Sequence, residues 1–194
     1  MTDDTLIRAA QSGNEEAFKE LIRRYEHKVA TAVIGMLGPG PEAEDVGQEV
    51  FIRFYQTMDR FRGEASLGTY LTRIAINLSL NVLKKRKRRR MLFWDAPVEM
   101  IQAIPGPEAS EVDDDDKDLI RKAVQTLDPA FRSVIVLRLM QGYSTRETAE
   151  ILDIPEGTVL SRLARAQKKL KELLTPYFGA DHEREHSQVA ASIV

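Results

Sequence analysis

The sequence of 194 residues contains no cysteine, which excludes disulfides, thiolate catalysis and zinc sites with cysteine ligands. It has three histidines, His27, His182 and His186, and none stands in a spacing typical of a metal site or an activated nucleophile. No apolar run approaches the roughly 20 residues of a membrane helix, and the start, MTDDTLIRAA, lacks a basic region followed by an apolar signal core. We therefore expect a cytoplasmic protein that does not insert into a membrane, binds no metal or cofactor, and is not an enzyme.

Charge is distributed unevenly along the chain, although the net charge is only −2. Residues 1–90 carry 16 Lys/Arg and 12 Asp/Glu, residues 91–118 carry 1 and 9, and residues 119–178 carry 10 and 6. Two basic blocks separated by an acidic segment indicate two contacts with a polyanion. The acidic segment would be repelled by nucleic acid or could lie on a basic surface.

The apolar pattern predicts an all-α fold of two small helical domains joined by a flexible linker, with a helix-turn-helix in the second domain. We expect the first domain over residues 1–90 and the second over 117–178. The linker, residues 91–116, contains three prolines and shows no sustained period, and it includes Phe93 and Trp94 as apolar anchors. A polar tail follows at residues 179–194.

In the first domain, amphipathic helices are expected from Asn14, from just after Pro41, and from Leu67. The second of these should bury Val46, Val50, Phe51, Phe54, Tyr55 and Met58, which leaves Asp45, Gln48 and Glu49 on its outer face. Such a polar face is more often simply solvated than a partner site.

The third helix ends in seven consecutive cations, Lys84 to Arg90. A few cations near a helix C-terminus are favourable, but seven repel one another without a counter-charge, so a polyanion is the expected partner. Arg73, Asn77 and Asn81 step along the side opposite the apolar stripe toward this basic end. Their amides and guanidinium can hydrogen-bond bases and phosphates.

The stretch from Tyr143 to Lys171 reads as a helix-turn-helix. Ser144 and Glu147 form a capping box that starts a short helix, and Asp153-Ile154-Pro155 interrupts the run before a second helix begins. One face of the second helix carries short polar groups followed by cations: Thr158, Ser161, Arg162, Arg165, Lys168 and Lys169. That face suits a DNA major groove. A solvated face on a packed helix is the alternative reading.

With both basic blocks placed, the sequence resembles a group 4, or extracytoplasmic-function (ECF), RNA polymerase sigma factor of the sigma-70 family. EAEDVGQEVFIRFYQTMDRFRG resembles region 2.2 and the start of region 2.3, and ASLGTYLTRIAINLSLNVLKKRKRR resembles regions 2.3 to 2.4. The last 60 residues or so resemble region 4, with its GTVxSRLxRA signature.

The resemblance implies promoter-specific initiation through minus-10 and minus-35 recognition and strand opening. Its implied partners are core RNA polymerase (the β′ clamp helices and the β flap), promoter DNA and an anti-sigma factor. Asp45, Gln48 and Glu49 would face the clamp helices. The minus-10 contacts implied are Phe61, Arg62, Arg73, Asn77, Asn81, Lys84, Lys85, Arg86 and Arg88, with the loop from Phe61 to Ala65 holding a flipped base. The minus-35 contacts implied are Thr158, Ser161, Arg162, Arg165, Lys168 and Lys169.

Four positions depart from the family pattern. Leu160 stands where many members carry Arg, so one usual base or phosphate contact is missing. Tyr70 and Thr72 stand where Trp and Tyr are common, and Pro155 replaces a polar helix cap. An alternative function remains open at this point: a stand-alone helix-turn-helix regulator that binds duplex DNA without polymerase.

Overall fold

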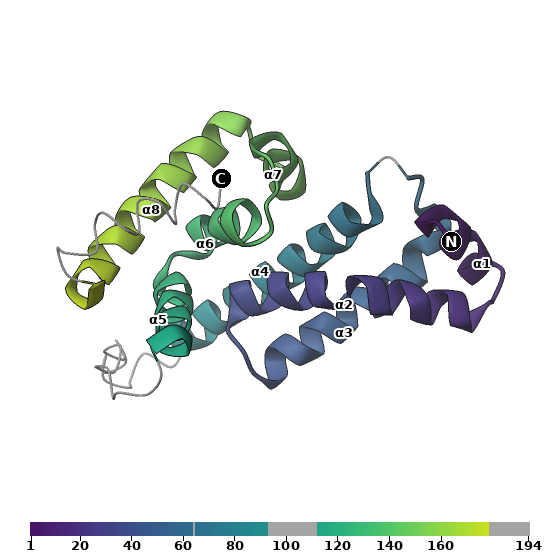
Figure 1. The fold of residues 1–194 in the computed structure, drawn as a ribbon, viewed down its shortest axis with the longest axis horizontal. Helices are drawn as coiled ribbons and strands as arrows, with labels where there is room; N and C mark the ends of the chain where they lie inside the picture. Colours follow the sequence, from purple (N-terminus) through teal and green to yellow (C-terminus); the bar gives the residue numbers. More distant parts are fainter. Residues whose placement is uncertain (64, 93–111, 179–194) are drawn as a thin grey trace.

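The computed structural model describes residues 1–63, 65–92 and 112–178, and these ranges form helices and turns without any strand (Figure 1). The helices are α1 (Asp3–Gln11), α2 (Glu15–Leu37), α3 (Pro41–Thr57), α4 (Leu67–Leu92), α5 (Val112–Thr126), α6 (Pro129–Ile135), α7 (Thr145–Leu152) and α8 (Glu156–Phe178). A 3₁₀ turn, η1 (Met58–Arg60), follows α3, and a π-helical turn, η2 (Val136–Met140), follows α6. The all-α fold class is confirmed. Most of the predicted linker, with Phe93 and Trp94, lies outside the described residues, as does the predicted tail.

Helices α1 to α4 make an N-terminal bundle, residues 1–92, in which α2 packs against both α3 and α4 (Figure 1). Asn14 caps α2 by accepting a hydrogen bond from the Ala17 N–H at 3.1 Å, which confirms the predicted start of that helix. Val33, Phe54 and Ile76 are fully buried between the helices. One predicted core residue is wrong: Tyr55 is 57% exposed on the outer face of α3, where its ring packs edge-on against Phe18.

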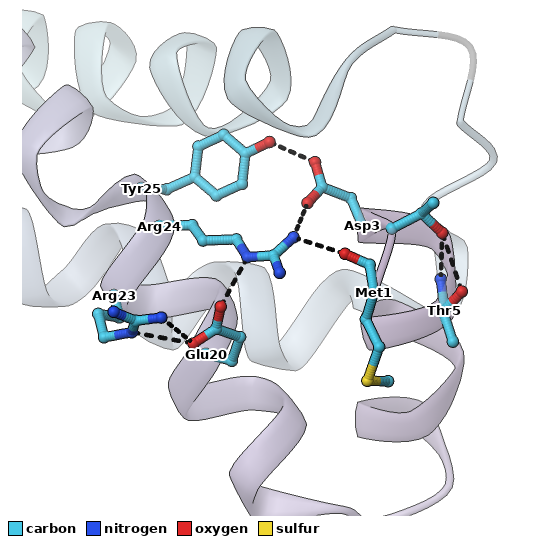
Figure 2. Close-up of polar contacts among 8 residues, drawn as sticks. Met1, Asp3, Thr5, Glu20, Arg23, Arg24 and Tyr25 are labelled. Atoms are coloured by element: carbon cyan, nitrogen blue, oxygen red, sulfur yellow. Dashed lines mark hydrogen bonds and ion pairs between the residues drawn. The ribbon is translucent and has the colours of Figure 1, made fainter.

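Helix α1 was not expected from the sequence, and polar contacts to α2 hold it in place (Figure 2). The Arg24 guanidinium donates to the Asp3 carboxylate at 3.2 Å and to the Met1 carbonyl at 3.0 Å. The Tyr25 hydroxyl donates to the same carboxylate. Burial raises the pKa of Tyr25 to about 12, and Asp3 adds to that rise, so the phenol stays protonated as the donor at neutral pH.

Helices α5 to α8 make a C-terminal unit, residues 112–178, built around two small apolar clusters. One cluster includes Val124, Ile135 and Ala166, and the other joins Val134, Ala149 and Val159. The predicted capping box is confirmed: the Glu147 N–H donates to the Ser144 hydroxyl at 3.2 Å, and the Ser144 N–H donates to the Glu147 carboxylate at 2.8 Å.

The turn between α7 and α8 is made by Asp153, which adopts a left-handed conformation with φ 53°. The Ile154 N–H then donates to the Ala149 carbonyl at 3.1 Å, which closes the end of α7. Pro155 stands directly before α8, and its carbonyl accepts from the Thr158 N–H at 2.9 Å. The predicted helix-turn-helix is therefore present, with α8 as its second helix.

The C-terminal unit packs directly on the N-terminal bundle, and the two approach each other closely at Gly35 of α2. A Cβ at this position would lie 2.8 Å from Val136 Cγ2 and 3.2 Å from its Cγ1. Any larger side chain would collide there, so this glycine, inside an otherwise regular helix, lets η2 lie against α2. Val136, Leu137, Tyr143 and Ile151 join the N-terminal core in one continuous apolar cluster.

Two side chains of the C-terminal unit donate hydrogen bonds to the last turn of α2. The Arg132 side chain, only 6% exposed, donates to the Met36 carbonyl at 2.5 Å, and the Gln125 amide donates to the Gly35 carbonyl at 2.7 Å. The last carbonyls of a helix have no partner within it, so the C-terminal unit supplies donors that α2 lacks. Burial lowers the pKa of Arg132 to about 10, with the nearby cation Arg86 as a second cause, and the side chain remains charged at neutral pH.

Candidate nucleic-acid interface

The outer face of α4 carries the polar line predicted for it. Arg73, Asn77 and Asn81 are all exposed, while the intervening Ala75, Ile76 and Leu78 are buried. The line leads into the basic end of the helix, where Lys84, Lys85 and Arg88 are exposed. The structure thus places the predicted amides and cations along one continuous helix, as contact with a nucleic-acid strand would require.

Arg86 differs from the other cations of that run. Its Nε donates to the Glu42 carboxylate of α3 at 2.8 Å, and its Nη1 lies 3.5 Å from the Leu37 carbonyl at the end of α2. The side chain is half-buried. Arg86 therefore has a counter-charge within the protein, contrary to the expectation that the whole run needs an external polyanion. Its predicted contact with nucleic acid would require breaking this pair.

The loop after η1 holds Phe61 and Arg62 beside the start of α4. Arg62 is exposed. The Phe61 ring is half-buried in an aromatic cluster, with its centroid 5.1 Å from that of Tyr70 and 6.3 Å from that of Phe54. Tyr70, one of the positions that depart from the family pattern, also shares a hydrogen bond of 3.1 Å with the Thr57 hydroxyl. The cluster fixes one side of the loop in which a base is expected to bind.

The predicted reading face of α8 lies away from the helix's buried side. Ser161, Arg165, Lys168 and Lys169 are exposed, whereas Thr158 and Arg162 are half-buried. The Lys169 ammonium lies 5.4 Å from the centroid of the Phe131 ring, a cation–π distance. In Figure 1, α8 lies on the far side of α6 from the N-terminal bundle. The packing of the two units therefore leaves this face of α8 open.

The outer face of α3 holds the acidic residues and a feature that the sequence reading missed. Asp45 and Gln48 are exposed, while Glu49 is half-buried and accepts from Arg53 at 2.8 Å. Ile52 is 49% exposed and continues the same line, as does Tyr55. The spacing of Asp45, Gln48, Ile52 and Tyr55 at i, i+3, i+7 and i+10 is visible in the sequence, but the apolar pattern alone predicts Tyr55 in the core.

The C-terminal unit occupies part of the polar line on α4. The Arg73 guanidinium donates to the Glu150 carbonyl of α7 at 2.6 Å. One residue earlier, the buried Thr72 hydroxyl shares a hydrogen bond of 2.9 Å with the Tyr143 hydroxyl. Arg73 therefore cannot use the same donor on nucleic acid while α7 stays against α4.

Neither a metal site nor a membrane helix is found in the part of the chain that the structure describes. No group of three or more His, Asp or Glu side chains gathers there in a way that could hold a metal ion. Among the same residues, no helix combines the length and the apolarity needed to span a bilayer.

Known families and structures match both units. The model for sigma-70 region 2 matches residues 21–89, and the model for sigma-70 region 4 matches residues 117–170. The chain is 34% identical over 187 residues to the ECF RNA polymerase sigma-E factor of Escherichia coli (strain K12), covering 91% of this chain and 96% of that protein. It is 32% identical over 182 residues to the RNA polymerase sigma-H factor of Pseudomonas aeruginosa, covering 90% and 94%.

Solved structures share the fold, and two of them are similar to this chain over most of its length. One is CnrH in complex with the cytosolic domain of CnrY, with a TM-score of 0.66, 26% identity, and coverage of 90% of this chain and 98% of that one. The other is the sigma factor RpoE in complex with the anti-sigma factor NepR from Bartonella quintana, with a TM-score of 0.65, 25% identity, and coverage of 81% and 96%.

Proposed function

Since the chain belongs to the sigma-70 family of RNA polymerase sigma factors, in its extracytoplasmic-function group, we propose how its surfaces divide the work of promoter-specific transcription. The N-terminal bundle binds core polymerase and the minus-10 strand, and α8 reads the minus-35 duplex. The chain contributes recognition and no chemistry of its own, and it acts in the cytoplasm. The observation that carries this division is the pair of exposed polar faces, one on α4 and one on α8, in units that match regions 2 and 4.

Transcription from a defined promoter by purified core polymerase, with and without this protein, tests the function. A stand-alone regulator would bind duplex DNA but would not confer initiation on core polymerase. The region 2 match over residues 21–89 disfavours that alternative. Transcripts that depend on the added protein support the proposal, and binding to promoter duplex without such transcripts would favour the regulator.

On α8 we expect Arg165 to select a base. It is exposed one turn beyond Ser161, where a bidentate contact to a guanine edge is possible in the major groove. Arg165→Ala should relax one minus-35 position by about 1–3 kcal/mol and leave the other positions unchanged. Open-complex affinity on a panel of single-base promoter variants measures this. A uniform loss of affinity for every variant would show that Arg165 contacts phosphate instead.

On α4 we expect Arg88 to bind phosphate and Arg86 to stabilise the fold. Arg88→Ala should weaken all promoters alike and flatten the log–log salt dependence by about 0.7–0.9 per lost contact, depending on whether the strand is single or double. Arg86→Ala removes the partly exposed pair with Glu42, so it should lower the free energy of unfolding by up to about 1 kcal/mol. Its salt slope should match that of wild type.

Salt titrations of open-complex affinity and urea unfolding, made on both variants, separate these two roles. The variants remove the same charge two residues apart, so each is the control for the other. An equal loss of salt slope in both would mean that Arg86 leaves Glu42 to bind DNA.

Promoter binding also requires the two units to separate. Elements centred near minus 10 and minus 35 lie about 25 base pairs apart, which is roughly 85 Å along the duplex at about 3.4 Å per base pair. Here α7 touches α4, and α8, with 23 residues, is only about 35 Å long at roughly 1.5 Å per residue. The packed arrangement cannot span both elements, so we assign it to the free protein.

We propose an anti-sigma factor as a further partner of this chain. The basis is the likeness to RpoE bound to the anti-sigma factor NepR, at 25% identity over 81% of this chain. The packed arrangement, in which Arg73 is already occupied by the Glu150 carbonyl, is a state that such an inhibitor could stabilise by binding across both units.

A further inference from the structure

Leu160 is the feature of α8 that the contacts proposed above leave unexplained. The residue is 54% exposed, in a helix whose other large aliphatic residues are buried or half-buried: Val159, Leu163, Leu170, Leu173 and Leu174. Single exposed apolar residues are ordinary on protein surfaces, so exposure alone carries little weight. What gives Leu160 meaning is its position at the edge of the exposed side of α8, directly before Ser161 of the reading face.

A line of small residues runs along the exposed side of α8. Gly157, Ser161 and Ala164 follow one another at i, i+4 and i+7, and all three are exposed. An added Cβ on Gly157 would meet nothing within 4 Å. A helix with so few protruding atoms along one line can sit deep in a major groove about 12 Å wide.

Leu160 and Arg165 lie on opposite sides of this line of small residues. At roughly 100° per residue, Leu160 falls on one side of the line and Arg165 on the other. Each is thus placed to reach the edge of a base pair, one with an apolar side chain and one with a guanidinium. Lys168, further along the line, is exposed and supplies the positive charge that holds the helix to the backbone.

The chemistry of the major groove restricts what Leu160 can recognise there. A leucine has no donor or acceptor, so it cannot read the hydrogen-bonding groups of a base. The C5-methyl of thymine is the apolar group that base edges present in this groove. We propose that Leu160 reads one thymine of the minus-35 element by packing against its methyl group, on the opposite side of α8 from the base pair read by Arg165. This inference rests on the proposed role of α8.

Replacing thymine by deoxyuridine tests the contact, because it removes that methyl group and nothing else. Core polymerase with the full chain is first used to select minus-35 sequences from a randomised promoter library. Each enriched thymine is then replaced singly by deoxyuridine, and open-complex affinity is measured. For the wild-type chain, one replacement should lower affinity about fourfold, the value of one buried methyl-sized group.

Two variants of Leu160 complete the design, together with Arg165→Ala as the matched control. Leu160→Ala should be insensitive to deoxyuridine at that position alone. Leu160→Arg should lose the same sensitivity and select guanine near that position instead. Arg165→Ala should keep the full fourfold effect. Because Leu160 and Arg165 are both exposed, all three variants should keep the wild-type melting temperature.

Three results would overturn the inference. The first is a minus-35 element with no deoxyuridine-sensitive thymine. The second is the same sensitivity in Leu160→Ala as in wild type, which would mean that Leu160 faces something other than DNA, such as a partner protein. In both cases an enriched element would still support the role of α8. The third is the absence of any minus-35 enrichment, which would overturn both that role and this inference.

Discussion

Oxidised Gly35→Cys/Val136→Cys protein should support no more transcription than core polymerase alone, and reduction should restore activity. The reason is that a disulfide at this site would hold η2 against α2 and so prevent the two units from spanning the promoter. The chain has no native cysteine, so these two thiols can only pair with each other within one molecule. The effect should therefore be close to complete in the cross-linked fraction.

The geometry at this site suits a disulfide. Such a bond requires Cβ atoms about 3.5–4.5 Å apart. A Cβ at residue 35 would lie 2.8–3.2 Å from the two Val136 Cγ atoms, whose positions approximate where an introduced sulfur at residue 136 would sit. Replacing Val136 by cysteine also removes one of the two methyl groups that would collide with the new side chain. The cross-link should therefore form without displacing either helix.

The measurement is multi-round transcription from a defined promoter, with the cross-linked fraction quantified by non-reducing electrophoresis. Val136→Cys alone, treated with the same oxidant, is the matched control and should stay active. Wild-type activity in fully cross-linked protein would show that the packed arrangement is compatible with initiation, and our assignment of that arrangement to the free protein would then be wrong.

Reversing the acidic charge on α3 should have the second large effect. Asp45→Arg/Glu49→Arg should weaken binding to core polymerase by at least about 2 kcal/mol, or roughly thirtyfold, the lower end for disrupting a charge pair in an interface. The fold should survive, because Asp45 is exposed and Glu49 makes only a surface pair with Arg53. Losing that pair and placing a cation beside Arg53 costs a few tenths of a kcal/mol each.

Binding of fluorescently labelled protein to core polymerase measures the effect, and thermal unfolding of the free variant monitors its fold. Glu42→Arg/Glu44→Arg reverses two charges one turn earlier on the same helix and controls for net charge. It also removes the Glu42–Arg86 pair, so its unfolding must be measured alongside. Wild-type affinity in the Asp45/Glu49 variant would rule out this face as the polymerase contact.

Much of the fold could be predicted because its signals are local. The Asn14 cap, the Ser144–Glu147 capping box and the recurring apolar residues each lie within one or two helical turns. Helix α1 was not predicted. It has only nine residues and three buried side chains, which are too few to show a clear helical period of apolar residues. The prediction for Tyr55 is wrong because this aromatic residue lies next to the apolar face of α3 in the helical pattern. Its spacing fits the outer face of the helix as well.

The exposure predicted for the recognition surfaces agrees with the structure at some residues and not at others. The exposed line of Arg73, Asn77 and Asn81 on α4 could be predicted directly from the helical spacing of these residues. The pairing of Arg86 with Glu42 could not be predicted, because the two residues are 44 positions apart and Glu42 looks like an ordinary acidic residue in the first turn of a helix. The packing of α7 on α4 left no sequence pattern either, since the Arg73 contact ends on a main-chain carbonyl.

The polar part of the contact between the two units consists mainly of hydrogen bonds from side chains to the main chain. Five side chains donate across it to main-chain carbonyls: Arg73 to Glu150, Gln125 to Ile34 and Gly35, Arg132 to Met36, Gln141 to Lys28, and Tyr143 to Gly68. A carbonyl persists whatever side chain its residue carries, so the accepting positions can change in evolution without a compensating change opposite. Among homologues, the residue pairs joined by these hydrogen bonds should therefore show weak covariation, and methods that infer contacts from covariation should underestimate this part of the contact.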